Sequence, residues 1–342
     1  MTPSTPSCGN SPMSLLDVEH LRVEFPTRHG VLVAVDDVSF SIDEGEVLGV
    51  VGESGAGKSI TGLAIIGLLD RPGRIARGTI RFGGQKINGL PKEAMRRIRG
   101  AKIGAIFQDP LTSLNPLYTI GRQLVETITT HNDLTLSQAR GRAIDLLNEV
   151  GISAADRRID CYPHEFSGGM RQRVVVALAL CANPQLIIAD EPTTALDVSI
   201  QAQIIALLRR LCRDHRTAII LITHDMGVIA ETSDRVAVMY AGRFAEIGSL
   251  RDVIKSPKHP YTVGLMNSIP IIGHEIEDLP HINGSMPRLH EIPPGCAFNP
   301  RCSRAVDRCR VERPDFMPTG NPGQMASCWV FDKESGNDGN GR

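Results

Sequence analysis

Hydrophobic and polar residues alternate over residues 15–42, and this period of two predicts antiparallel strands with breaks at Gly30 and at the pair Asp36 and Asp37. Short, almost wholly apolar runs predict the buried strands of a parallel sheet, at 47–51, 186–189 and 218–223. Further strand patterns lie at 78–87, at 102–107 and, as a hairpin, at 235–248. Helical patterns lie at 60–69, at 119–150 with a break near 131–136, at 167–182 and at 200–213. The chain is therefore predicted to have an α/β fold.

The composition changes after Leu250, where Pro and Cys become frequent and long periodic runs end. We therefore predict a boundary there, with a main domain over 13–250 and a small extension over 251–333. The two ends, 1–12 and 334–342, are polar and poor in hydrophobic residues, and we expect them to be disordered. Because ordered-looking sequence begins only at Leu15, Met13 competes with Met1 as the true start.

The charge balance gives no reason to expect nucleic-acid binding. Lys and Arg number 37 against 38 Asp and Glu, and the isoelectric point is about 6.8. No apolar run approaches about 18 residues, so no membrane span is expected. The N-terminus lacks the charged and apolar regions of a signal peptide. We therefore expect a protein of the cytosol.

A glycine-rich motif directly follows the apolar run at 47–51. It matches the pattern G-x-x-x-x-G-K-[ST] with the residues Gly52, Glu53, Ser54, Gly55, Ala56, Gly57, Lys58 and Ser59. A strand before the motif and a helix after it are the setting in which backbone N–H groups surround phosphates. Lys58 supplies a charge for the outer phosphates, and Ser59 supplies a hydroxyl ligand for Mg²⁺. The motif predicts a nucleotide site.

Two acids, Asp190 and Glu191, end the apolar run at 186–189. Asp190 can hold Mg²⁺ through water, and Glu191 can act as the general base on the attacking water. The alternative is an acidic turn with no chemical role. Phosphoryl transfer needs both a phosphate loop and such acids, so the upstream motif favours the chemical interpretation.

A third motif, Ser167, Gly168 and Gly169, begins the predicted helix at 167–182. Ser167 is a natural N-cap, and the glycines leave N–H groups free for phosphate; the alternative is a capped helix and no more. Here the chain resembles an ATP-binding-cassette (ABC) ATPase. That family carries Leu-Ser-Gly-Gly-Gln at this place, whereas this chain reads Phe-Ser-Gly-Gly-Met and departs at the first and fifth positions. Together with the Arg-Gln-Arg that follows, this motif resembles the sequence found in the peptide-importer branch of the family.

The resemblance extends over about 15–250 and implies further roles in ATP binding and hydrolysis. Gln108 matches the glutamine that senses Mg²⁺ and the attacking water, and Asp197 matches the D-loop aspartate. His224 matches the histidine that contacts the γ-phosphate, and Phe25 is the candidate for stacking on adenine. The family fold implied is a cassette with a mixed sheet core, an antiparallel β subdomain and a helical subdomain at about 109–170.

The C-terminal segment contains a cluster of four cysteines, Cys296, Cys302, Cys309 and Cys328. In a cytosolic protein such a cluster indicates a metal rather than disulfides. The segments 256–262 and 294–302 resemble the extension of oligopeptide, dipeptide and nickel importers, in which four cysteines can hold a [4Fe–4S] cluster. The spacings lack the C-x₂-C pairs common in zinc ribbons, which favours iron–sulfur over zinc. Unligated thiols are the remaining alternative.

The family resemblance also implies an assembly. The signature motif of one subunit closes on the nucleotide of another, so we expect a second cassette subunit, which in this branch is a different chain. Two transmembrane permease subunits and an extracytoplasmic solute-binding protein complete such importers, which places this chain at the cytoplasmic face of the inner membrane. We therefore expect an ATPase subunit of a peptide importer. A nickel or other small-solute importer is the alternative, and a soluble ABC ATPase acting on DNA or ribosomes is a weaker one.

Overall fold

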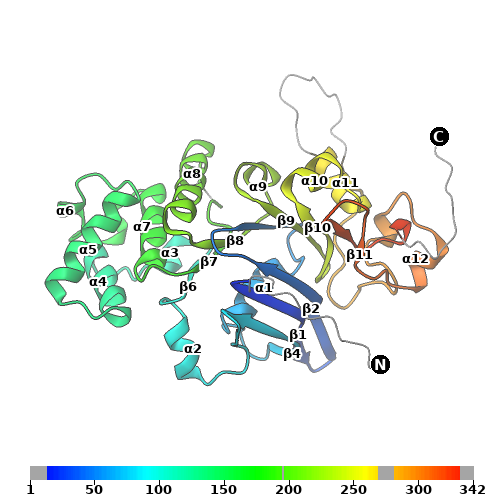
Figure 1. The fold of residues 1–342 in the computed structure, drawn as a ribbon, viewed down its shortest axis with the longest axis horizontal. Helices are drawn as coiled ribbons and strands as arrows, with labels where there is room; N and C mark the ends of the chain where they lie inside the picture. The colour runs from blue at the N-terminus through cyan, green and yellow to red at the C-terminus, as the bar shows by residue number, and fades with distance from the viewer. Residues whose placement is uncertain (1–13, 195, 269–280, 332–342) are drawn as a thin grey trace, which may run out of the picture.

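A mixed eight-stranded sheet runs through the centre of the computed structural model, which describes residues 14–194, 196–268 and 281–331 (Figure 1). The strand order is β11-β12-β10-β9-β3-β8-β7-β6. Strands β9, β3, β8, β7 and β6 are parallel, and β10 is antiparallel to β9. The bounds are β3 Val47–Val51, β6 Ile103–Ile106, β7 Leu186–Asp190, β8 Ala218–Thr223, β9 Arg235–Tyr240, β10 Arg243–Ser249, β11 Met317–Pro318 and β12 Met325–Ala326. The predicted α/β fold with a mixed sheet is confirmed.

A second sheet of four antiparallel strands, in the order β2-β1-β4-β5, packs beside the first. Its strands are β1 Leu16–Thr27, β2 Gly30–Ile42, β4 Arg74–Phe82 and β5 Gln85–Lys86. The alternating pattern at 15–42 correctly predicted β1 and β2. The inward residues of these strands, among them Leu16, Val38 and Ile80, are fully buried.

The helices flank the main sheet and form a separate group at one end of it, where α4 and α5 lie beside α7 and α6 lies beside α5 (Figure 1). Their bounds are α1 Lys58–Ile65, α2 Lys92–Ile98, α3 Pro110–Ser113, α4 Ile120–His131, α5 Leu136–Glu149, α6 Ala155–Arg158, α7 Gly168–Leu180, α8 Val198–His215, α9 Met226–Thr232, α10 Leu250–Lys255, α11 Pro260–Asn267 and α12 Asp307–Val311. The break predicted near 131–136 is confirmed, and Thr135 begins α5 with a capping box to Gln138. No described helix is both long enough and apolar enough to cross a bilayer.

Sequence reasoning placed the end of one helix wrongly and overlooked several short helices, among them α2 and α9. Helix α1 ends at Ile65 instead of continuing to Leu69. Gly67 has a φ of +64°, and the N–H groups of Gly67 and Leu68 bond to the carbonyls of Ala64 and Leu63. This is the Schellman arrangement, in which a glycine takes the left-handed conformation that ends a helix. Helices α2 and α9 have only seven residues each, too few to show a clear period.

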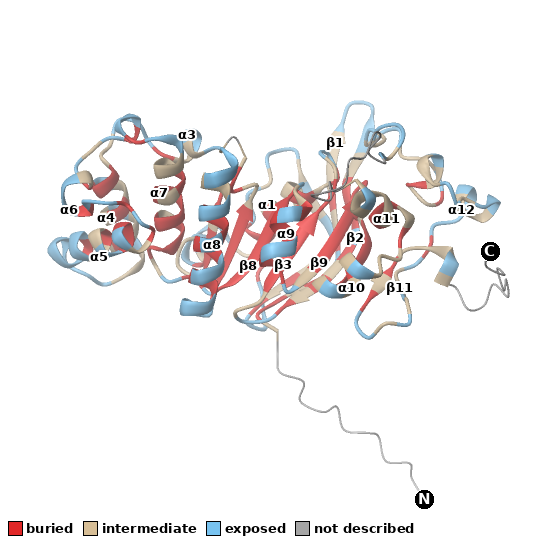
Figure 2. Ribbon diagram, turned by 90° about the horizontal axis from the view of Figure 1, so that it is seen from above, coloured by how far each residue is buried: buried red, intermediate tan, exposed pale blue. Residues whose placement is uncertain are grey.

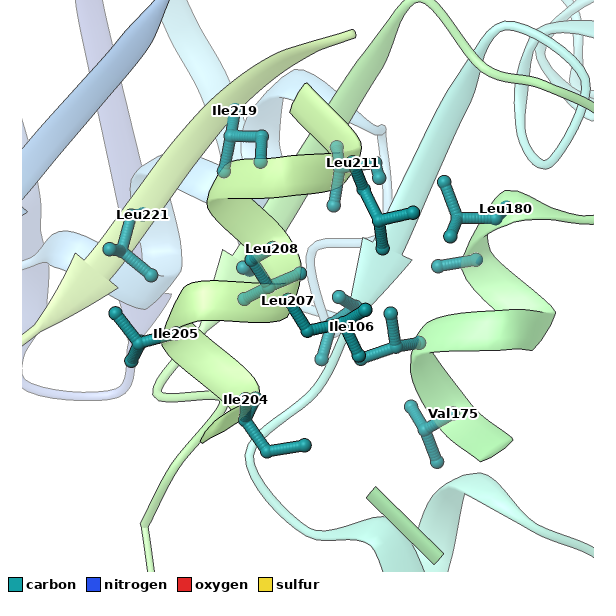
Figure 3. Packing of buried hydrophobic residues seen from close by; sticks show 14 of the residues in the cluster. Ile106, Val175, Leu180, Ile204, Ile205, Leu207, Leu208, Leu211, Ile219 and Leu221 are labelled. Atoms are coloured by element: carbon teal, nitrogen blue, oxygen red, sulfur yellow. The ribbon is translucent and has the colours of Figure 1, made fainter. Parts of the chain in front are cut away.

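The hydrophobic core lies between the main sheet and its helices, and Figure 2 shows the buried strands enclosed by them. On α8, Ile204, Leu207, Leu208 and Leu211 point toward α7, β6 and β8 (Figure 3). Each of these side chains is at most 5% exposed. At about 1.5–3 kcal/mol for each buried aliphatic side chain, this layer fixes α8 and the loop before it against the sheet.

The C-terminal segment packs onto the cassette. Strand β12 pairs with β10 and extends the main sheet, and Tyr261 and Phe298 belong to the same core cluster as the sheet. The fully buried carboxylate of Glu246 accepts hydrogen bonds from the backbone N–H groups of Lys258 and His259 and from the side chain of Gln324. The main sheet and the hydrophobic core therefore continue across the boundary predicted near residue 250. The predicted disordered ends and the choice between Met1 and Met13 lie outside the described residues.

Candidate nucleotide site

The candidate residues meet at the carboxyl ends of four neighbouring parallel strands. The phosphate loop follows β3, Gln108 follows β6, Asp190 and Glu191 end β7, and His224 follows β8. In open α/β sheets ligands bind at this edge. Lys58 and His224, which are 166 positions apart in the chain, therefore line one space.

The phosphate loop curls around its own lysine. The Lys58 ammonium donates to the carbonyls of Gly52, at 2.8 Å, and Glu53, at 3.0 Å. Gly57 has a φ of +103°, and a Cβ there would lie 2.7 Å from the carbonyl oxygen of Ala34, so no other residue fits. Burial lowers the pKa of Lys58, while nearby carboxylates favour its charged form. In this conformation the residues from Ser54 to Ile60 line the pocket in which a phosphate would lie.

Ser59 and Asp190 form the part of the site that suits a divalent cation. The Ser59 hydroxyl donates to Asp190 Oδ1 at 2.9 Å, so the two oxygens predicted to hold Mg²⁺ already lie together. Burial raises the pKa of Asp190, and the hydrogen bond from Ser59 opposes this rise. A bound cation would relieve the cost of a buried carboxylate. The donor set therefore fits Mg²⁺.

Three side chains hold the Glu191 carboxylate in place. Gln108 Nε2 donates to Oε2 at 3.0 Å and Thr194 Oγ1 at 2.8 Å, while His224 Nδ1 lies 3.2 Å from Oε1. Burial by itself raises the pKa of Glu191, but the hydrogen bonds from Thr194 and His224 and the charge of Lys58 lower it overall. The carboxylate is therefore ionised at neutral pH, as a general base must be. Its roles and those of Gln108 and His224 stay predictions.

Backbone strain marks the same residue. Glu191 has a φ of +47°, in the left-handed region that non-glycine residues rarely adopt. Its N–H donates to the carbonyl of Ile222 on β8 at 2.8 Å, which holds the turn. Such strain persists only where the surroundings enforce it, and it concentrates at functional sites.

A pocket of about 710 Å³ joins these groups. Its lining runs from Ser54 to Ile60 and includes Gln108, Glu191 and His224. Sequence reasoning did not include Ala34, on β2, and Leu289, from the C-terminal segment, which also line it. No local sequence pattern indicates either residue, because both reach the pocket only through tertiary packing.

Ser167, Gly168 and Gly169, at the start of α7, do not line this pocket. The Ser167 hydroxyl accepts from the N–H of Met170 at 3.4 Å, which is the predicted N-cap. A Cβ on Gly169 would lie 2.7 Å from the side chain of Ile200 on α8, so this part of the motif is close to the start of the next helix.

Asp197 and Phe25, also predicted to contact the nucleotide, lie outside the pocket, as do Gly52 and Glu53 at the start of the phosphate loop. Asp197 caps α8 by accepting from the N–H of Ile200 at 3.0 Å. Phe25 lies on β1, and its ring is 2.6 Å from the position of a Cβ on Gly73. The proposed contact of Phe25 with adenine stays a prediction.

The four C-terminal cysteines line a different pocket, of about 450 Å³. Burial, followed by the proximity of the three other thiols, raises the pKa of Cys296 to about 11. Burial also raises the pKa values of Cys302 and Cys328. Within the described ranges, no set of three or more His, Cys, Asp or Glu side chains is placed to hold a single metal ion. The structure thus brings the four thiols around one cavity.

The structure combines a phosphate loop and paired acids on a mixed sheet, with an antiparallel sheet and a helical group beside it. This combination defines an ATP-binding-cassette ATPase. Residues 35–194 match the family described as ABC transporter, and residues 245–309 match the oligopeptide/dipeptide transporter, C-terminal region. The chain belongs to the ATPase subunits of ABC transporters that carry this C-terminal region. As a member of this family it binds ATP with Mg²⁺ and hydrolyses ATP in transport.

Similar proteins cover almost the whole chain. It is 48% identical over 316 residues to the dipeptide transport ATP-binding protein DppD of Escherichia coli, covering 92% of this chain and 96% of that protein. It is 46% identical over 322 residues to the oligopeptide transport ATP-binding protein AppD of Bacillus subtilis, covering 94% and 98%. The solved dimeric structure of a bacterial ABC transporter cassette matches with a TM-score of 0.61 and 31% identity, covering 69% of this chain and 99% of that chain.

Proposed function

We propose that this chain hydrolyses ATP to drive the uptake of dipeptides or oligopeptides through membrane-embedded partners. The observation that carries this proposal is the match of residues 245–309, together with similarity to peptide-transport subunits over more than nine-tenths of the chain. The nucleotide site alone does not distinguish one transported solute from another. The C-terminal segment therefore supplies the support for peptide as the solute.

We also propose that two cassettes act head to tail, the second being a different chain. Ser167 and Gly168 are exposed and lie outside the pocket of their own chain, so they are free to contact a nucleotide held by another subunit. Val198, next to Asp197 at the start of α8, is 83% exposed and gives this face an apolar contact. The solved relative with a TM-score of 0.61 is itself a dimer.

The proposed membrane partners are two permease subunits, with a solute-binding protein on the other side of the membrane. A groove of about 380 Å³, lined among others by Phe107, Ser113, Val175 and Leu178, lies between the segment after β6 and α7. Leu117, nearby in the chain, is 80% exposed. An apolar groove next to Gln108 suits a permease segment that senses the nucleotide state. The proposed location of the chain is therefore the cytoplasmic face of the inner membrane.

Peptide uptake by the assembled importer tests the proposed function. The chain, co-purified with the permease and cassette subunits encoded beside it and placed in vesicles with the binding protein, should take up labelled dipeptides or oligopeptides when ATP is supplied. Lys58→Ala should abolish uptake, because the phosphates lose the charge that the buried ammonium provides. Lys92→Ala, at an exposed lysine of α2, is the control and should leave uptake unchanged. Uptake of nickel ions without peptide uptake would contradict the proposal.

We propose in addition that Cys296, Cys302, Cys309 and Cys328 hold a [4Fe–4S] cluster, with zinc as the alternative. Support comes from the single cavity that the four thiols share. A tetrahedral zinc ion needs its four sulfurs about 2.3 Å away, whereas a cavity of about 450 Å³ with no single-ion geometry suits a larger group. Bound iron would offset the burial and mutual repulsion that disfavour the thiolates. The group would stabilise a segment with little secondary structure.

Metal analysis tests the cysteine site. Protein purified without oxygen should be brown and carry about four irons per chain. Cys309→Ser should lower the iron content strongly, whereas Cys161→Ser, at a free cysteine outside the cavity, should not. Colourless protein with one zinc per chain would contradict the iron–sulfur cluster and support zinc at the same cysteines. Protein without metal, in which all four thiols react freely while the chain stays folded, would contradict the site.

A further inference from the structure

The C-terminal segment reaches the phosphate loop at one residue, Glu53. Arg301 Nη1 donates to both carboxylate oxygens of Glu53, at 3.0 and 3.1 Å. The hydroxyl of Tyr261 accepts a hydrogen bond from the Glu53 N–H at 2.9 Å. The Glu53 carbonyl accepts from Lys58 within the loop, at 3.0 Å. The same carbonyl accepts from the Ala56 N–H at 3.2 Å. Every polar group of Glu53 therefore has a partner, and the partners of its N–H and its carboxylate belong to the C-terminal segment.

Arg301 is itself held rigidly. Its side chain is 8% exposed, and it donates to the carbonyls of Asn283, at 2.8 Å, and Gly284, at 3.2 Å. Its guanidinium also contacts Tyr240 of β9, 3.4 Å from the phenol oxygen. An arginine fixed by carbonyls on one side presents its remaining N–H groups in a set direction, and a charge-assisted pair of this kind is stronger than a neutral hydrogen bond.

Tyr261 is fixed just as firmly. It is fully buried, and its ring packs edge-on against Tyr240 and against Phe298, with ring centroids 4.7 and 5.4 Å apart. It stands in the segment 256–262, which resembles importer extensions and to which the nucleotide site assigns no role. Residues on α11 and on the short helix 299–301 thus converge on the second residue of the phosphate loop.

We propose that Arg301 and Tyr261 are positioning residues for the phosphate loop, so that the C-terminal segment sets the affinity of the cassette for ATP. Glu53 does not line the nucleotide pocket, so its contacts act through the loop backbone. With Glu53 held, the loop residues that follow it and line the pocket keep their conformation before nucleotide arrives. Releasing Glu53 lets the loop relax, and ATP must then reorder it at the expense of binding free energy. The inference rests on the assignment of the ATP site.

ATP affinity of the full-length chain, measured by calorimetry with a non-hydrolysable ATP analogue and Mg²⁺, tests the inference. Arg301→Met and Glu53→Gln should each raise the Kd about tenfold, the change expected when a partly buried ion pair loses one member. The double variant should bind no more weakly than either single variant, because both remove the same contact. Arg310→Met, at an exposed arginine of the same segment, is the control and should bind as the unaltered chain does.

Tyr261→Phe provides an independent variant that keeps the buried ring and removes only the acceptor of the Glu53 N–H. It should also raise the Kd, and with saturating ATP the turnover of the assembled importer should stay near normal while KM rises. An unchanged Kd in both Arg301→Met and Tyr261→Phe would overturn the inference. So would additive losses in the Arg301→Met, Glu53→Gln double variant, which would indicate a general structural role. A chain that binds ATP as expected but transports no peptide would refute the proposed function and leave this inference standing.

Discussion

Glu191→Gln should leave ATP binding nearly unchanged while lowering ATP turnover in the assembled importer by about 10²–10⁴-fold. The phosphate contacts come from the loop around Lys58, and this substitution does not touch them. The amide keeps the size of the carboxylate and can still accept from Thr194, but it cannot take a proton from water. In the proposed head-to-tail arrangement, hydrolysis reopens the nucleotide-bound dimer, so the variant should accumulate as a dimer with ATP trapped.

Turnover measured at saturating ATP, together with size-exclusion chromatography in ATP and Mg²⁺, checks this result. Glu93→Gln is a suitable control because Glu93 is exposed on α2 and its ion pair with Arg96 is at the surface. Near-normal turnover of Glu191→Gln would remove Glu191 from the role of general base. A matching loss of ATP affinity would instead indicate that Glu191 shapes the pocket and does not act on water.

Ser167→Arg should disable the nucleotide site of the neighbouring subunit and spare the phosphate loop of its own chain. Ser167 is exposed at the start of α7 and does not line its own pocket, so a bulky cation there would meet the partner's nucleotide first. With both sites required for cooperative hydrolysis, importer turnover should fall by at least about tenfold. Nucleotide photolabelling of each cassette separately shows which phosphate loop has been affected.

The substitution also removes a helix cap, which costs about 1 kcal/mol. Ser167→Asn keeps an N-cap and serves as the control, and melting temperatures separate loss of the cap from loss of the site. Labelling lost only at the phosphate loop of the altered chain itself would contradict the head-to-tail arrangement.

Local hydrophobic patterns in the sequence predicted much of the fold. The alternation at 15–42 predicted β1 and β2, and the apolar runs predicted β3, β7 and β8, because burial on one face or both imposes a period that the sequence displays. The predicted end of α1 was wrong because the apolar run 63–69 continues past Gly67, although a glycine at that place is typical of a helix end. The short helices α2 and α9 lacked enough turns to show a period.

The sequence by itself indicated the candidate residues of the nucleotide site: the phosphate loop and the paired acids through their motifs, and Gln108 and His224 through the family resemblance. Parallel strands with their carboxyl ends at one edge bring such motifs together in any chain of this topology. Only the tertiary structure decided which distant groups hold them. Arg301 meets Glu53 across 248 residues, and β12 joins β10. These contacts depend on packing and on an ion pair, and neither leaves a periodic trace in the sequence.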